Sequence, residues 1–248
     1  MTLPEKFNPT GSSPWMFYGV VGSQAHGLAN ANSDTDLLGV YLEFPELFLG
    51  LKIPVASDLS SVSTEPDVSM HEISKFLRLA LGCNPTLLEL LWLPELKYNL
   101  DHPLSDHFSW PVKNRGLLLS ETTVRKAFGG YAFSQAQRLQ RREKNGTTGF
   151  SSDTKKRTAK HARHCFRLMI MAKQLLETGE MIVDVSEYKD QLYSMGDLAA
   201  KNPDEFFLEF VKFESQIDKI ESVLPESPDR DAVNDWLLQL RRQQYLHY

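Results

Sequence analysis

The spacing of apolar residues changes near residue 86, and this change constrains the fold more than any other feature of the sequence. Upstream, short apolar or alternating runs predict strands at 15–21, 35–42 and 67–73, followed by a helix at 74–81. Downstream, longer runs predict helices at 87–93, 122–140, 158–177 and 203–223. We therefore expect an α+β protein, in which an α/β module with a short mixed sheet (residues 1–115) precedes a helical module (residues 116–248).

The composition is that of a globular protein, with 42% hydrophobic and 24% charged residues in a chain of 248. No run approaches the roughly 18 consecutive apolar residues of a membrane helix, and the first residues do not resemble a signal peptide. We therefore expect a cytoplasmic protein without membrane contact. Cys83 and Cys165 lie in apolar helical patterns, which favours two core thiols over a disulfide or a zinc site.

The net charge of −5 hides a strongly basic segment. Ten basic and two acidic residues lie between Arg138 and Arg167, a local charge of +8 that leaves −13 for the rest. Such a segment is expected where a protein binds the phosphates of a nucleotide or of RNA, although a solvated helix face is the simpler alternative. Its polar centre, residues 141–156, contains a turn at 145–149 and is the best candidate for a moving loop.

A Gly-Ser pair directly follows the first predicted strand. Glycine lets the backbone turn sharply and approach a ligand, and a helix that opens behind it directs free N–H groups at an anion. Gly22 and Ser23 are thus predicted to hold a terminal phosphate. Gly27 would keep the helix start free of a side chain where the phosphate chain passes.

Asp34 and Asp36 are two residues apart, so on a strand both side chains leave the same face, about 6–7 Å apart. Two such carboxylates can hold one Mg²⁺ or Mn²⁺ and share a second, with substrate phosphates as further ligands. This arrangement suits in-line transfer at a nucleoside triphosphate. Alone, a Gly-Ser pair or a Ser-Asp-Thr-Asp string is more often a simple turn, but their order within about 20 residues favours the functional interpretation.

The string Gly-Ser-x-Ala-x-Gly, five further residues and then Ser-Asp-x-Asp-Leu (22–37) is similar to the signature of polymerase-β-type nucleotidyltransferases. Further segments resemble the RlaP-like family of that superfamily, which is assigned to RNA repair: 75–91, 128–135, 160–164 and 175–180. The resemblance spans roughly residues 17–182. It implies a polymerase-β-like catalytic module and transfer of a nucleoside monophosphate from a triphosphate, with Mg²⁺ or Mn²⁺, onto RNA. It also places Ser33 among the nucleotide-binding residues.

The superfamily pattern requires a third carboxylate on a neighbouring strand, and the strand at 67–73 offers Asp67 and Glu72. Asp67 shares a face with Ser69, whereas Glu72 shares the apolar face of Met70. We favour Asp67, because it begins the strand and leaves the apolar face intact, and keep Glu72 as the alternative. The third carboxylate would hold the second metal ion and help activate the acceptor hydroxyl.

Three basic positions of the second half share one helix face, because Lys160, His164 and Arg167 recur at i, i+4 and i+7. They are predicted to meet the triphosphate across the cleft, with a salt-bridged surface as the alternative. His26 either fixes the phosphate turn or titrates in catalysis. Glu89 and Arg78 lie among apolar residues and are predicted to form a structural ion pair.

The leading hypothesis is a nucleotidyltransferase that adds to or repairs the 3′ end of tRNA or another RNA, with segment 138–167 guiding the RNA backbone. The same site could instead adenylylate a protein hydroxyl. A non-catalytic nucleotide-sensing module is a second alternative, against which the intact Asp34 and Asp36 count. A calcium-stabilised structural protein is a third, but it leaves the Gly-Ser turn unexplained.

Overall fold

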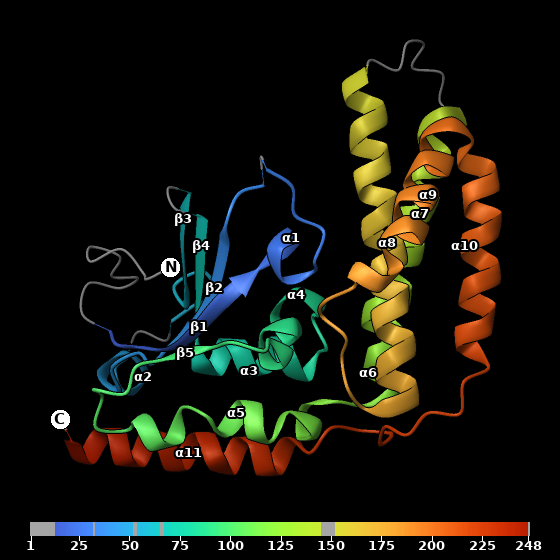
Figure 1. Cartoon of the computed structure of the whole chain (residues 1–248). Helices are drawn as coiled ribbons and strands as arrows, with labels where there is room; N and C mark the ends of the chain where they lie inside the picture. Colours follow the sequence, from blue (N-terminus) through green and yellow to red (C-terminus); the bar gives the residue numbers. More distant parts are fainter. Residues whose placement is uncertain (1–12, 32, 52–53, 65–66, 145–151, 248) are drawn as a thin grey trace.

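A five-stranded mixed sheet stands beside a bundle of long helices (Figure 1). This arrangement is seen in a computed structural model that describes residues 13–31, 33–51, 54–64, 67–144 and 152–247. It confirms the predicted α+β fold, with a mixed sheet in the first half and mostly helices in the second.

The sheet has the strand order β3-β4-β2-β1-β5. Its strands are β1 (Trp15–Val21), β2 (Asp36–Tyr41), β3 (Ser60–Thr64), β4 (Asp67–Glu72) and β5 (Lys97–Tyr98). Only β2 and β4 run parallel; the other neighbours are antiparallel. The predicted strands correspond to β1, β2 and β4, whereas β3 and β5 were not predicted, because β3 is a polar edge strand and β5 has two residues.

Most of the first half's helices are short: α1 (Gly22–Ala25), α2 (Glu46–Leu49), α3 (Ile73–Leu81), α4 (Pro85–Leu88), α5 (Trp110–Lys113) and α6 (Glu121–Val124). Single 3₁₀ turns follow α4 at Glu89–Trp92 and α5 at Arg115–Leu118, and a π-helical turn, Arg125–Gly130, follows α6. Pro85 starts α4 with its fixed φ, and Asn84 caps it by accepting a hydrogen bond from the backbone N–H of Leu87 at 3.3 Å.

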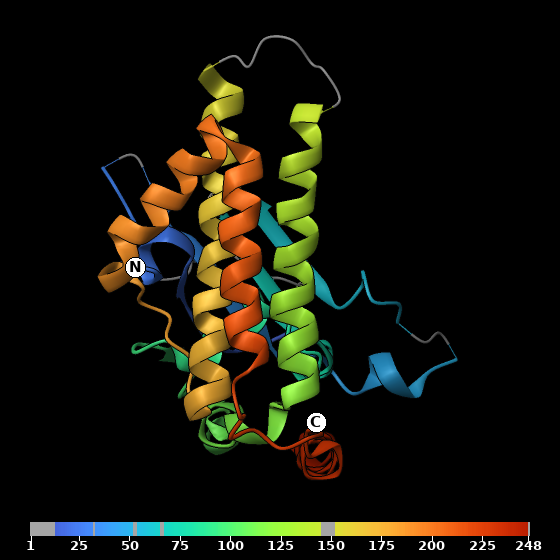
Figure 2. The same ribbon diagram turned by 90° about the vertical axis from the view of Figure 1, so that its right-hand side faces the viewer.

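The long helices are α7 (Tyr131–Lys144), α8 (Ser152–Thr178), α9 (Lys189–Lys201), α10 (Pro203–Asp218) and α11 (Arg230–His247). The first four form the bundle, in which α7, α8 and α10 stand side by side (Figure 2). The last, α11, leaves the bundle and returns beneath α3 and α5 (Figure 1). The patterns at 122–140, 158–177 and 203–223 thus predicted the bundle, whereas α9 and α11 were not predicted.

Both halves of the chain share one continuous core, in which buried residues of β1, α3, α8 and α11 pack together. On α11, Trp236 stacks on Trp110 with ring centroids 4.6 Å apart, and Leu240 is fully buried. The division near residue 115 stays a prediction, and it did not anticipate that α11 would pack against the N-terminal half. Cys83 and Cys165 are buried, as predicted, both are free cysteines, and burial raises the pKa of both thiols.

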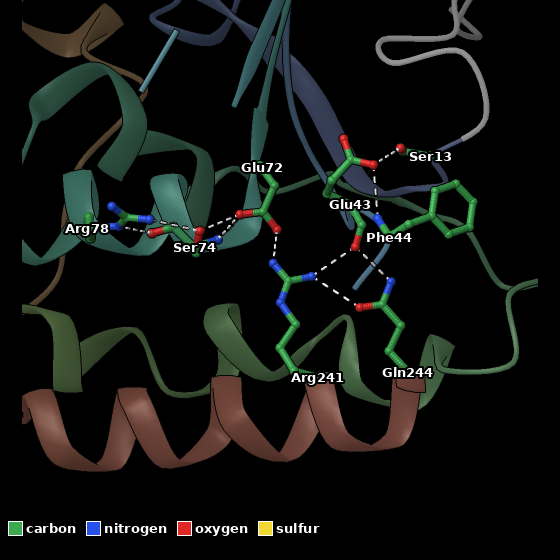
Figure 3. Close-up of polar contacts among 8 residues, drawn as sticks. All are labelled: Ser13, Glu43, Phe44, Glu72, Ser74, Arg78, Arg241 and Gln244. Atoms are coloured by element: carbon green, nitrogen blue, oxygen red, sulfur yellow. Dashed lines mark hydrogen bonds and ion pairs between the residues drawn. The ribbon is translucent and has the colours of Figure 1, made fainter. Parts of the chain in front are cut away.

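A buried polar cluster fastens α11 to the sheet (Figure 3). Arg241 forms an ion pair with Glu72 and donates a 3.0 Å hydrogen bond to the carbonyl oxygen of Glu43. Gln244 donates to the same carbonyl at 2.8 Å. We call Glu43, Glu72, Arg241 and Gln244 the α11 network. Of the helices that the structure describes, none is both long enough and apolar enough to cross a membrane.

Candidate active site

A polar cleft of about 630 Å³ lies between the sheet module and the helical bundle. Its near wall is formed by α1, the segment before β2 and the start of β4; its far wall is formed by α8 and α9. All but one of the site residues predicted with Asp67 as third carboxylate line it: Gly22, Ser23, Ser33, Asp34, Asp36, Asp67, Lys160, His164 and Arg167. The exception is Gly27. The structure thus brings together residues that are up to 145 positions apart in the sequence.

The carboxylates of Asp36 and Asp67 lie close together because β2 and β4 are parallel and begin at the same end of the sheet. Leu37 pairs with Val68, so the preceding residues, Asp36 and Asp67, lie side by side on one face. Asp34 lies just before β2. Ser33 stabilises the turn that leads into β2, since its hydroxyl accepts a 2.9 Å hydrogen bond from the backbone N–H of Asn30.

The pKa of Asp36 is raised, first by burial and then by the negative charges of Asp67 and Asp34. A bound cation would relieve this repulsion, so these carboxylates suit a hard divalent metal ion. Over the described parts of the chain, no three His, Cys, Asp or Glu side chains already stand in the geometry of a complete metal site. Carboxylate oxygens are hard ligands of the kind that Mg²⁺ or Mn²⁺ prefers, so these aspartates could hold such an ion.

Glu72, the alternative third carboxylate, does not reach the cleft. It ends β4, five residues after Asp67, which is roughly 16 Å along a strand. Its side chain is fully buried, pairs with Arg241 and accepts a 2.7 Å hydrogen bond from the backbone N–H of Ser74 (Figure 3). The Glu72 alternative is therefore wrong for this cleft, because that carboxylate is already used to cap α3 and hold α11.

Gly22 is required by its contact with Asp36. Its φ is +71°, and a Cβ atom there would lie 2.2 Å from Asp36 Oδ2. A side chain at this position would displace the carboxylate, and the backbone would also be strained. The turn that follows Gly22 is closed by a 2.9 Å hydrogen bond from the backbone N–H of Leu28 to the carbonyl oxygen of Ser23.

Gly27 has a different role from the predicted one. Its φ is +67°, and a Cβ atom would lie 2.5 Å from Asp184 Oδ1 and 2.8 Å from Ser186 Cβ. The carbonyl oxygen of His26 accepts a 3.1 Å hydrogen bond from the backbone N–H of Val185. Gly27 thus allows the segment between α8 and α9 to pack against the turn, rather than leaving room for a phosphate chain.

Beneath the turn lies a buried ion cluster that joins the two halves. Glu89 Oε2 lies 2.9 Å from His26 Nε2 and 3.3 Å from Arg167 Nη1, which also contacts His26. Arg78 instead is exposed, and its guanidinium donates to the backbone oxygen and hydroxyl of Ser74, both at 3.1 Å. The predicted Glu89–Arg78 pair is therefore wrong, because the partner of Glu89 comes from α8, 78 residues later.

His164 extends this cluster to the cleft surface. Arg167 Nη2 lies 3.2 Å from His164 Nδ1. Since a guanidinium only donates, Nδ1 accepts and the proton of the neutral ring is on Nε2. Burial, followed by the nearby Arg167 charge, lowers the pKa of His164 to about 4. His164 is thus a neutral N–H donor at neutral pH. We call Glu89, His26, Arg167 and His164 the Arg167 network.

The charge on the far wall comes from Lys160 and from Arg163, which was not singled out in the sequence. Lys160 is exposed, whereas Arg167 is nearly buried and used in its network. The guanidinium of Arg163 stacks over the ring of Tyr193 at 4.6 Å. Arg163 lay within the basic segment but outside the i, i+4, i+7 pattern that selected Lys160, His164 and Arg167. Tyr193 was not found because α9 was not predicted.

The remainder of the basic segment continues along α8, where residues 155–157 are exposed. Arg138 is exposed on α7. The turn predicted at 145–149 lies outside the described residues, as do the side chains of 141–154. The segment therefore supplies basic groups both inside the cleft and along the helix that leads away from it.

A Gly-Ser turn, aspartates at the start of parallel strands and a facing helical half define the polymerase-β-like nucleotidyltransferase class. A family model described as RlaP, RNA repair pathway DNA polymerase beta family, matches residues 6–204, and the chain belongs to this family. Its name points to a nucleotidyltransferase of RNA repair. Among curated proteins, none matches the chain. The matched range contains the whole cleft and ends before α11.

Proposed function

We propose that the protein is a metal-dependent nucleotidyltransferase that moves a nucleoside monophosphate from a nucleoside triphosphate to the 3′ hydroxyl of an RNA, such as a tRNA. One observation carries this proposal: Asp36 and Asp67 lie side by side in a cleft whose opposite wall presents Lys160. In such a cleft a cation site on one wall faces an anion site on the other. Family membership supports the same reaction class.

In this proposal Asp34, Asp36 and Asp67 hold Mg²⁺ or Mn²⁺, which when bound neutralises charge on the reacting phosphates. Gly22, Ser23 and Ser33 bind the nucleotide on the near wall; Lys160, Arg163 and the neutral N–H of His164 bind it on the far wall. Arg167 acts through His164, so we assign it a positioning role.

The acceptor oxygen attacks the α-phosphorus, the bond from that phosphorus to the α,β-bridging oxygen breaks, and pyrophosphate leaves. Asp67 accepts the proton of the acceptor hydroxyl. The exposed residues 155–157 of α8 offer an electrostatic path for an RNA backbone toward the cleft.

The test is transfer of label from each [α-³²P]nucleoside triphosphate, with Mg²⁺ or Mn²⁺, onto total RNA and total protein. Wild type is compared with Asp34→Asn/Asp36→Asn and with Asp235→Asn, an exposed acid on α11, as the matched control. We expect label on RNA that disappears in the double variant and with EDTA, and that persists in the control. Label on protein alone would make the acceptor a protein hydroxyl. Triphosphate binding without any label would indicate a nucleotide-sensing module instead.

A further inference from the structure

A second pocket, of about 440 Å³, adjoins the candidate active site. It lies where the turn from α3 to α4 faces α7 and α8, and we call it the side pocket. His164 lines both the side pocket and the aspartate cleft, and among the described residues it alone is common to the two linings. A ligand in the side pocket would therefore lie next to a nucleotide in the cleft.

The side pocket combines an open aromatic ring with a cation. Tyr131 is 46% exposed, and its ring meets His164 edge-on, with centroids 6.0 Å apart. Arg78 also lines the pocket, and among the described residues no acidic side chain contributes to the lining. Leu79 and Leu168 supply apolar surface. An exposed aromatic ring beside an arginine is the arrangement with which proteins bind single-stranded nucleotides, through stacking and a phosphate contact.

The polar groups of the pocket are held in place but retain free donors. The guanidinium of Arg78 is anchored on Ser74 through Nε and Nη2, which leaves Nη1. Asn84 caps α4 through Oδ1, which leaves its amide nitrogen. The hydroxyl of Thr86 has no partner among the described residues. Fixed side chains with uncommitted hydrogen-bonding atoms are typical of a binding site, because little conformational entropy is lost on binding.

We infer that the side pocket binds the terminal nucleotide of the acceptor RNA, with its base stacked on Tyr131 and its phosphate at Arg78. This inference rests on the proposed function. Transfer requires the acceptor hydroxyl next to the α-phosphate, so the terminal nucleotide must occupy space that adjoins the cleft. The cleft has an aromatic and an apolar side chain of its own for the donor base, Tyr193 and Leu28.

His164 stands at the junction as a hydrogen-bond donor to the sugar or phosphate of either nucleotide. Because its Nδ1 is occupied by Arg167, its Nε2–H is the donor that remains. A neutral donor can bind both partners without repelling the metal ion.

Steady-state kinetics separates the two pockets. We compare Tyr131→Ala and Arg78→Gln with matched variants far from both pockets, Tyr245→Ala and Arg242→Gln on α11. The first two should raise the KM for RNA about 10-fold, the effect expected for one lost base stack or phosphate contact. They should leave the KM for triphosphate and the kcat at saturating RNA unchanged. The two controls should change neither constant.

A photo-crosslink gives a readout that does not depend on activity. RNA with 4-thiouridine at its 3′-terminal position is irradiated on the wild-type protein, and the linked peptides are mapped by mass spectrometry. Attachment to Tyr131 or within 78–86 is expected. Attachment confined to other peptides, or a rise in the KM for triphosphate instead of RNA, overturns the inference while leaving the proposed function intact. Absence of transfer to RNA by wild type, including label that goes only to protein, overturns both.

Discussion

Two buried networks join the halves of the molecule, and they differ in what lies beside them. In the Arg167 network, Glu89 is 3% exposed and pairs with an arginine of α8. In the α11 network, Glu72 is fully buried and pairs with Arg241 of α11 (Figure 3). Each therefore places a glutamate of the N-terminal half against an arginine of the C-terminal half.

The difference is that only the Arg167 network reaches the cleft, through Arg167, His164 and His26. The α11 network lies at the opposite end of β4, in a part of the molecule that includes a helix beyond the family match. A buried ion pair has a large effect when one partner is removed, because the other charge remains without compensation. The same arginine-to-methionine substitution in the two networks should therefore separate an effect on stability alone from an effect on both stability and catalysis.

The largest effect is expected for Arg167→Met. It leaves Glu89 buried beside His26 and frees His164 from its orienting contact, so unfolding free energy should fall by about 3–5 kcal/mol. The KM for triphosphate should also rise, since His164 and the Gly-Ser turn lose their support. Urea denaturation and steady-state kinetics at low temperature measure both. Normal kinetics in this variant would remove Arg167 from the positioning role.

The same change in the other network, Arg241→Met, should lower stability by about 3 kcal/mol, the lower end of that range. Glu72 keeps the hydrogen bonds from Ser74, and the Arg241 side chain is 18% exposed, so less charge is left without compensation. Transfer per folded molecule should match wild type. A matching loss of activity would show that α11 supports the cleft after all, and the two networks would not be separable.

The comparison also shows what could be predicted from the sequence. Asp36 and Asp67 could be placed together because the resemblance implies a third carboxylate on a neighbouring strand, and the alternation of side chains along that strand favours Asp67 over Glu72. The partner of Glu89 could not, since Arg167 is 78 residues away and nothing in the spacing of either residue specifies the other. The prediction paired Glu89 with Arg78 because only nearby charges could be weighed.

The other features that the sequence did not predict also depend on packing between segments that are far apart in the chain. The helix α11 has the apolar spacing of an ordinary amphipathic helix, so the sequence could not show that it returns to α3. Tyr193 became a cleft residue only through the packing of α9 on α8. Gly27 was predicted to leave room for a phosphate chain, but a Cβ atom there would meet Asp184, a residue of a connecting segment with no motif.

The networks also differ in their response to pH, because only the Arg167 network contains histidine. The folded-state pKa of His164, about 4, lies below its ordinary value of 6.5. Between these values the unfolded chain binds more protons, so stability falls as the pH is lowered through this window, by up to about 1.4 kcal/mol per unit. His164→Gln should remove the part of this pH dependence that His164 contributes, measured as the unfolding free energy in urea from pH 7 to 4.

Gln244→Ala, which removes no charge from the α11 network, should leave the slope unchanged. His71, whose pKa burial also lowers to about 4, belongs to neither network, and His71→Gln should remove a separate share of the same sign. An unchanged slope in His164→Gln would mean that folding does not lower the pKa of His164, contrary to its burial and its contact with Arg167.

The smallest effect is expected where an ion pair is short but exposed. Lys212 Nζ lies 2.6 Å from Glu209 on α10, closer than Arg167 lies to Glu89, yet the two side chains are 67% and 42% exposed. Water and salt screen such a pair, so Lys212→Ala should change the unfolding free energy by less than about 0.5 kcal/mol. Alanine's high helix propensity even favours a slight gain. Urea denaturation that shows a loss of unfolding free energy above about 1 kcal/mol would contradict this expectation. Burial, rather than distance, would then not explain why the two networks contribute more to stability.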